Sequence, residues 1–156
     1  MSFSTDSLTQ MLAVGYPNFG INFEIDWKIR AQRLLPLIKG LCTYHTDKID
    51  IAIEGEAVTP QNYEQFREYS HNNLKMCIIG NNTITPQDKV NNLRDFTSNN
   101  EWTADLDDTQ ILDLAKELIS QSKQLKQSCE RFNIQYFDTS SDFLGTINQA
   151  KTYLLS

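Results

Sequence analysis

The sequence predicts an α/β fold, a three-layer α/β/α domain built on a short, mostly parallel sheet. Short runs of β-branched or aromatic residues, typical of buried strands, alternate with longer segments of helical periodicity. The segments between the runs are long enough for the helical crossovers that parallel strands require. The chain has 156 residues, of which 40% are hydrophobic, so we expect a single domain over residues 1–156.

Three apolar runs are the predicted strands of this sheet. They cover residues 49–54, 76–79 and 135–137, and we expect all three to be parallel. Their bulk and shortness suit buried strands. Gly55 and Gly80 follow the first two runs and mark the turns there.

Helices are predicted between and around these strands. Thr59-Pro60 and Thr85-Pro86 are the same start signal, a threonine cap followed by proline at the first helical position. Pro36 lies inside another helical segment, where we expect a kink or two separate helices. The predicted helices cover residues 7–14, 24–44, 60–72, 86–96, 108–132 and 142–155.

The predicted core follows from the apolar faces of these helices and strands. It consists of Leu34, Leu37, Ile38, Ile51, Ile53, Ile78, Leu112, Ala115, Ile119 and Phe137. The last helix needs a cap at its start, for which Ser140 or Ser141 is expected.

Composition and charge exclude several classes of protein. Twenty acidic and fourteen basic residues give a net charge of −6 without a basic block, which is poorly suited to nucleic acid. No apolar stretch approaches the roughly 20 residues of a membrane span, and the opening residues lack the pattern of a signal peptide. Cys42, Cys77 and Cys129 are expected to be reduced thiols. We therefore expect a cytoplasmic protein with no nucleic-acid or membrane partner.

Candidate functional residues lie where the predicted strands end, because ligands of open parallel sheets bind beyond the carboxyl ends of the strands. Glu54 is either an acid that orients magnesium or a nucleophile, or a solvated carboxylate at a strand end. Asp6 either accepts a proton or hydrogen bond from a substrate hydroxyl, or caps helix 7–14. Asp138 either belongs to a ligand loop or caps the next turn by an Asx-type hydrogen bond.

Cations and metal-binding residue types give weaker indications. Lys89 and Arg94 follow the second predicted strand and either face solvent or approach a phosphate. His45 and His71 have no cysteine or acid at metal-ligand spacing, so no metal site is predicted. Cys42 and His45 as a nucleophilic pair remain an alternative to a structural cysteine.

Short segments along nearly the whole chain match one family in their order. Ser4-Thr5-Asp6-Ser7-Leu8 looks like that family's "STD-x-L" segment, and Ile51-Ala52-Ile53-Glu54-Gly55 looks like its "IIEG" strand end. The polar segment 80–107 is placed like a lid, and Tyr136-Phe137-Asp138-Thr139-Ser140 completes the order. On these marks the chain resembles P-loop kinases of the adenylate- and shikimate-kinase type.

The resemblance implies a three-layer fold and ATP-dependent phosphoryl transfer to the hydroxyl or phosphate of a small-molecule acceptor. In that interpretation Asp6 orients the acceptor and Glu54 acts on magnesium or water. Arg94 reaches the phosphates, and Thr139 and Ser140 lie near the base.

The family's phosphate-binding loop has no match in this sequence, because none of the six glycines belongs to a G-x-x-x-x-G-K-[ST] motif. The chain looks like such a kinase without its first strand, P-loop and first helix. The resemblance then implies no cofactor for this chain alone, and Mg-ATP if a P-loop segment lies upstream. A non-catalytic ligand-binding or protein-interaction module of the same fold is the alternative. The slot of the missing strand would be closed, or filled by another chain in a homodimer.

Overall fold

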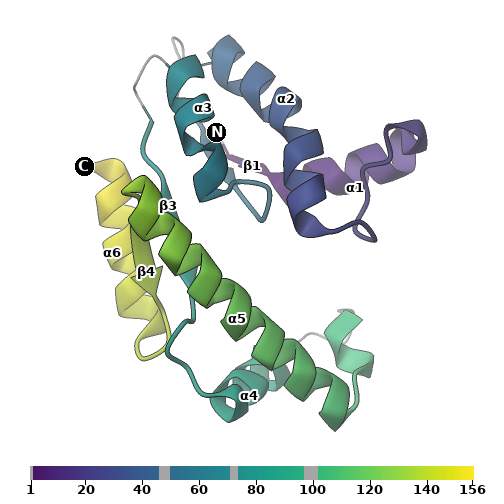
Figure 1. Ribbon diagram of the computed structural model, residues 1–156, viewed down its shortest axis with the longest axis vertical. Helices are drawn as coiled ribbons and strands as arrows, with labels where there is room; N and C mark the ends of the chain where they lie inside the picture. Colours follow the sequence, from purple (N-terminus) through teal and green to yellow (C-terminus); the bar gives the residue numbers. More distant parts are fainter. Residues whose placement is uncertain (1, 46–49, 71–73, 97–101) are drawn as a thin grey trace. The chain divides into compact units, whose positions relative to one another are not determined.

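The computed structural model describes residues 2–45, 50–70, 74–96 and 102–156 (Figure 1). The chain divides into two compact units, Met1–Lys75 and Met76–Ser156, called the first and second unit below. The single domain over residues 1–156 stays a prediction. Ile49, His71 and residues 97–101, to which some expectations applied, lie outside the described residues.

The first unit contains two short parallel strands, β1 (Ser2–Ser4) and β2 (Ala52–Glu54), with Phe3 opposite Ile53. Its helices are α1 (Thr5–Gly15), α2 (Trp27–His45) and α3 (Tyr63–Tyr69), with short 3-10 turns η1 (Pro17–Phe19) and η2 (Pro60–Asn62). The buried apolar side chains form one cluster: Leu12, Ile21, Ala31, Leu34, Ile38, Cys42, Ala57 and Phe66.

Two predictions about the helices of the first unit are corrected by the structure. Ser4 caps α1, since its hydroxyl oxygen accepts a hydrogen bond from the Ser7 amide at 3.4 Å. Asp6 therefore lies in the first turn, where a carboxylate favours the positive helix end, and is not the cap. Pro36 lies inside one helix, α2, so the alternative of two separate helices is wrong, while the alternative of a kink stays a prediction.

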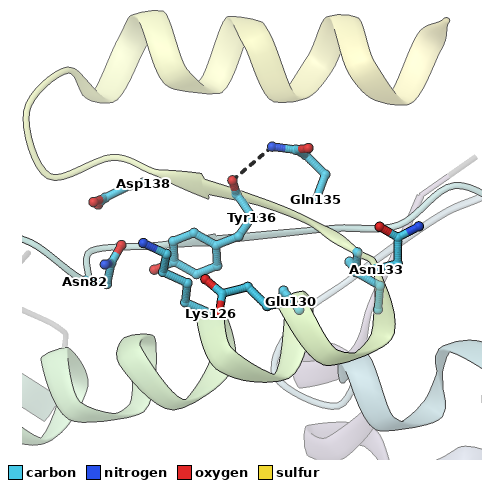
Figure 2. Close-up of a pocket in the computed structure, with 9 residues that line it drawn as sticks. Asn82, Lys126, Glu130, Asn133, Gln135, Tyr136 and Asp138 are labelled. Atoms are coloured by element: carbon cyan, nitrogen blue, oxygen red, sulfur yellow. Dashed lines mark hydrogen bonds between the residues drawn. The ribbon is translucent and has the colours of Figure 1, made fainter.

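The second unit also contains two parallel strands, β3 (Cys77–Gly80) and β4 (Gln135–Asp138), with Ile78 opposite Tyr136. Its helices are α4 (Pro86–Phe96), α5 (Asp108–Phe132) and α6 (Phe143–Leu155), with η3 (Trp102–Asp105) between α4 and α5. Helices α5 and α6 lie on opposite sides of β4 (Figure 2). On the α6 side, the Phe137 and Tyr153 rings meet edge to face, 5.9 Å apart.

Local signals determine the helix bounds of the second unit. The predicted ranges 86–96 and 108–132 are confirmed by α4 and α5. Asp107 and Gln110 form a reciprocal capping box at the start of α5, and Asn133 ends the helix in the left-handed conformation. The predicted serine cap of α6 is wrong, because Asp142 accepts the capping bond from the Gly145 amide at 2.9 Å.

The strand pairing confirms an α/β fold with parallel strands but not one continuous sheet. Within the described ranges, β1 pairs only with β2 and β3 only with β4. Each pair is joined by helices, as parallel strands require. A P-loop fold is not established by two sheets of two strands each.

The predicted core is confirmed in four of its helical members and is weaker in the others. Leu34, Ile38, Ala115 and Ile119 are buried. The other strand and helix members, Ile51, Ile53, Ile78, Leu112 and Phe137, are only half-buried. Leu37 is 39% exposed, so its assignment to the core is wrong. It lines a mainly apolar groove with Phe3, Leu8 and Met11. In the part of the chain that the structure describes, no helix combines the length and apolarity needed to cross a bilayer.

Candidate functional site

The carboxyl ends of β3 and β4 bring together the polar residues of two loops in the second unit. Gly80 is opposite Asp138 in the parallel register, so the segments that follow, Asn81–Thr83 and Thr139–Ser140, start side by side. The Thr139 amide donates to the Gly80 carbonyl at 2.9 Å, which extends the pairing by one residue. Ligands of parallel sheets bind at such an edge.

Asn81 is the centre of a hydrogen-bond network at this edge. Its backbone amide donates to the Ser122 hydroxyl of α5 at 3.2 Å. Its side-chain amide nitrogen donates to the Thr139 hydroxyl at 2.6 Å, and the ammonium of Lys89 donates to its side-chain oxygen at 2.8 Å. We call these four residues, Lys89, Asn81, Ser122 and Thr139, the Lys89 cluster. It joins α4, α5 and both strand ends.

Lys89 is the charged member of the cluster and is only partly exposed. Burial lowers the pKa of its ammonium below the ordinary value, because desolvation disfavours the charged form. Among the described residues no carboxylate forms an ion pair with it. The cluster therefore holds a partly desolvated cation for which the described residues offer no ion-pair partner.

Asp138 organises the two loops rather than facing a ligand with free oxygens. One of its oxygens accepts the Ser140 amide at 3.1 Å and the Ser140 hydroxyl, and the other accepts the Thr83 hydroxyl at 2.7 Å. Burial acts to raise the pKa of Asp138, but the bonds from Ser140 and Thr83 outweigh it and hold that pKa below its ordinary value. The Asx-type interpretation of Asp138 is thus confirmed by its contacts.

A groove adjoins these loops between the last turns of α5 and β4. It has a volume of about 400 Å³, and Figure 2 shows the side chains that line it. Tyr136 lies in it, and burial raises the pKa of its phenol to about 12. A Cβ at Gly80 would lie 2.3 Å from the Tyr136 hydroxyl oxygen, so glycine is required there by a close approach.

The first unit has its own polar strand ends, where Asp6 and Glu54 lie at one edge of the β1–β2 pair. Ser4 is opposite Glu54, and Asp6 follows two residues later. Both carboxylates are exposed, and neither forms an ion pair within the described ranges. Gly55 has a φ of +119°, and a Cβ there would lie 2.1 Å from the Thr5 hydroxyl oxygen. The turn after β2 thus packs against buried Thr5.

The other residues predicted for the site do not all lie at the strand ends. Thr139 and Ser140 follow β4 at the strand ends of the second unit, and their place near a base stays a prediction. Arg94 instead bonds to the Leu106 carbonyl at 3.1 Å and to the Asp108 carboxylate at 3.2 Å, before and at the start of α5. Its approach to phosphates stays a prediction. The sequence contained no signal for Ser122, which reaches the site through helix packing.

Metal and nucleophile sites have little support in the described residues. No group of three or more histidines, cysteines or acids in that part of the chain is arranged to hold a metal ion. All three cysteines are free, and burial raises the pKa of each thiol, that of Cys129 to about 11. A raised pKa leaves Cys42 a poor nucleophile, while the side chain of His45, its expected partner, lies outside the description. No protein-family model, curated protein or solved structure matches this chain.

Proposed function

We propose that the chain binds a small phosphate-bearing molecule at the Lys89 cluster of the second unit. The observation that carries this proposal is the Lys89 ammonium, which is partly buried without a carboxylate partner among the described residues. A cation partly withdrawn from water at the ends of parallel strands is stabilised when an anion joins it. The resemblance to P-loop kinases independently favours a phosphate.

The chemistry of the cluster suits a single phosphoryl group. Lysine has three N–H donors, and Lys89 uses one on Asn81, which leaves two for phosphate oxygens. Lysine binds phosphate as a point charge, so it needs hydroxyl groups nearby to orient the ligand. The Ser122 hydroxyl, which accepts the Asn81 amide, provides one, whereas the Thr139 hydroxyl already donates its proton to the Gly80 carbonyl at 3.1 Å. The proposed role of this chain is therefore ligand binding, without a transferred group.

A matched pair of lysine variants tests the phosphate site. Inorganic phosphate is titrated into the full chain and followed by NMR, with shifts expected for Gly80, Asn81 and Thr139. Lys89→Met should weaken binding at least about tenfold, because a hydrogen bond to a charged group contributes about 1.5–3 kcal/mol. Lys123→Met, an exposed change on α5, is the control and should bind like the parent chain. Equal weakening by both variants, or none by Lys89→Met, would overturn the proposal.

The expected affinity of this chain for Mg-ATP is low. A P-loop gives the phosphates several charge-assisted bonds, whereas the Lys89 cluster contributes one cation. Loss of three or four bonds of about 1.5–3 kcal/mol would remove most of a micromolar affinity, which corresponds to about 8 kcal/mol. Isothermal titration should give a dissociation constant weaker than about 10 μM. A tighter value would reveal a complete phosphate site.

Phosphoryl transfer is the second candidate, favoured by the common edge of Asp6 and Glu54 in the first unit. Asp6 would orient a hydroxyl or phosphate acceptor, and Glu54 would act on magnesium or water. This function needs a P-loop from outside the sequence printed here. A second copy that adds a strand is likewise a prediction, which light scattering on a sizing column tests. If a P-loop is joined, Glu54→Gln should lower turnover far more than ATP affinity.

A further inference from the structure

We propose that the groove between α5 and β4 binds a small zwitterion of the amino-acid type. This site is separate from the Lys89 cluster, and its ligand carries an ammonium and a carboxylate in place of a phosphate. The residues that line the groove are Asn82, Lys126, Cys129, Glu130, Asn133, Ile134, Gln135, Tyr136 and Asp138, of which the side chain of Gln135 points away from α5 (Figure 2). Its volume of about 400 Å³ is in the range of pockets for small molecules.

Two opposite charges from α5 line the groove one helical turn apart. Lys126 and Glu130 are four residues apart, so they share a face of the helix, with Cβ atoms about 5–6 Å apart. Figure 2 shows both side chains directed from α5 toward Tyr136. Within the described ranges, neither forms an ion pair, with the other or with a third residue. Both side chains are exposed, and the carboxylate of Asp138 also lines the groove, so a ligand with one charge would be matched by only one sign of the lining.

Asn82 gives the groove a polar group that lacks its own partner. Its side chain is 8% exposed, and its amide oxygen has no hydrogen-bond partner among the described residues. A buried carbonyl oxygen without a donor is uncommon and unfavourable. An N–H donor of the ligand meets this need. Because the oxygen is covered, the amide turns toward the groove as the ligand enters.

These groups assign the two ends of the ligand. The Lys126 ammonium binds the carboxylate, and the Glu130 carboxylate binds the ammonium, as charge-assisted hydrogen bonds. A further N–H of the ligand, from its ammonium or an amide side chain, reaches the Asn82 oxygen. The Tyr136 ring forms part of the wall, with its hydroxyl against Gly80. Gln135 lies on the other side of β4 in Figure 2, where its amide donates to the Tyr136 carbonyl at 3.2 Å.

The test uses L-glutamine and its two single-charge analogues on the full chain, followed by NMR. Glutaramate keeps the carboxylate and lacks the ammonium, and 4-aminobutanamide keeps the ammonium and lacks the carboxylate. L-Glutamine should shift the signals of Asn82, Glu130 and Tyr136 and bind at least about tenfold more tightly than either analogue. Equal binding of all three compounds would overturn the proposal, as would no binding of L-glutamine.

Variants then connect the discrimination to the groove. Lys126→Met should remove the preference for L-glutamine over 4-aminobutanamide, and Glu130→Gln the preference over glutaramate. The controls are Lys123→Met and Glu117→Gln on exposed positions of the same helix, which should keep both preferences. If either groove variant kept both preferences, or a control lost one, the ligand would bind elsewhere. Phosphate titration of the same variants keeps the two proposals apart, because Lys126 and Glu130 are not members of the Lys89 cluster.

Discussion

The two strand-end regions of this chain share an architecture and differ in chemistry. In each unit two parallel strands end beside each other in polar residues. In the first unit the acids Asp6 and Glu54 are exposed and have no ion pair within the described ranges. In the second unit Asn81 is bonded to three other residues, one of them a partly buried lysine.

The difference between the two units indicates how a candidate site arises at a strand end. A helix outside the strand pair adds polar side chains that bond to the strand-end residues. In the second unit, α4 contributes Lys89 and α5 contributes Ser122, and both side chains form hydrogen bonds with Asn81. In the first unit the turn after β2 packs on Thr5, which is buried, while the acids stay outside. Four comparisons of matched residues sharpen or break this contrast.

Truncation of a core side chain should give the largest loss of stability. Two leucines of α2 compare the core with the apolar groove of the first unit. Leu34 of α2 is fully buried, so Leu34→Ala should lower the free energy of unfolding by about 2–5 kcal/mol. Leu37→Ala on the same helix should change it by under about 1 kcal/mol, since that side chain is 39% exposed. Urea denaturation measures both. Similar losses of stability in both variants would mean that the face of α2 that carries Leu37 is covered in solution.

The glycines after β2 and β3 should differ in their tolerance of alanine. Gly80→Ala should cost about 1–3 kcal/mol of folding free energy, because its Cβ would meet the Tyr136 hydroxyl. Gly55→Ala should cost more, because its Cβ would meet Thr5 and its positive φ adds strain of about 1–3 kcal/mol. Thermal and urea unfolding of both variants check this order. Equal costs would contradict the strained turn at Gly55.

Lys89→Met should leave the free protein as stable as the parent chain, or make it slightly more stable. The pKa of Lys89 is lowered by burial, so its charge is disfavoured in the folded state at every pH below that pKa. The stability of the parent chain should therefore rise as the pH increases through this lowered pKa toward the ordinary value of lysine. Urea midpoints from pH 7 to 10.5 for both proteins test this. A marked loss of stability in Lys89→Met would identify Lys89 as a structural residue.

Asp138→Asn should have the smallest effect on stability. The effect should be present at pH 7 and should disappear at the acid end of the pH range. The pKa of Asp138 is held below its ordinary value, so its ionised form contributes stability above the ordinary value of aspartate. That contribution is lost as the pH falls through the lowered pKa. The variant should thus differ from the parent chain at pH 7 and converge with it at the acid end. Asp95→Asn on the exposed face of α4 serves as control and should show no such convergence.

Local sequence signals predicted the helices better than the strands. The ranges of α4 and α5 followed from proline at a helix start and from apolar periodicity, which act within a few residues. The division of the strands into two pairs depends on contacts between residues about 50 or more apart, such as Phe3 with Ile53 and Ile78 with Tyr136. Periodicity carries no information on such partners.

The candidate site was predictable in its location and in part of its members. The resemblance drew attention to Thr139 and Ser140, and both follow β4. The Asx-type alternative for Asp138 is confirmed, and it was predictable because that bond is local. The contacts of Asn81 with Ser122 and Lys89 bridge three elements, so they follow from helix packing rather than from local sequence.

The pKa of the Lys89 ammonium with and without phosphate tests the central claim most directly. NMR of the lysine side chains over a pH series reports the ionisation of this one group. Without phosphate the pKa should lie below the ordinary value of lysine, as burial requires. Saturating inorganic phosphate should raise it, because an anion bound to the ammonium stabilises the charged form. A pKa that stays the same when phosphate is added would contradict a phosphate site at Lys89.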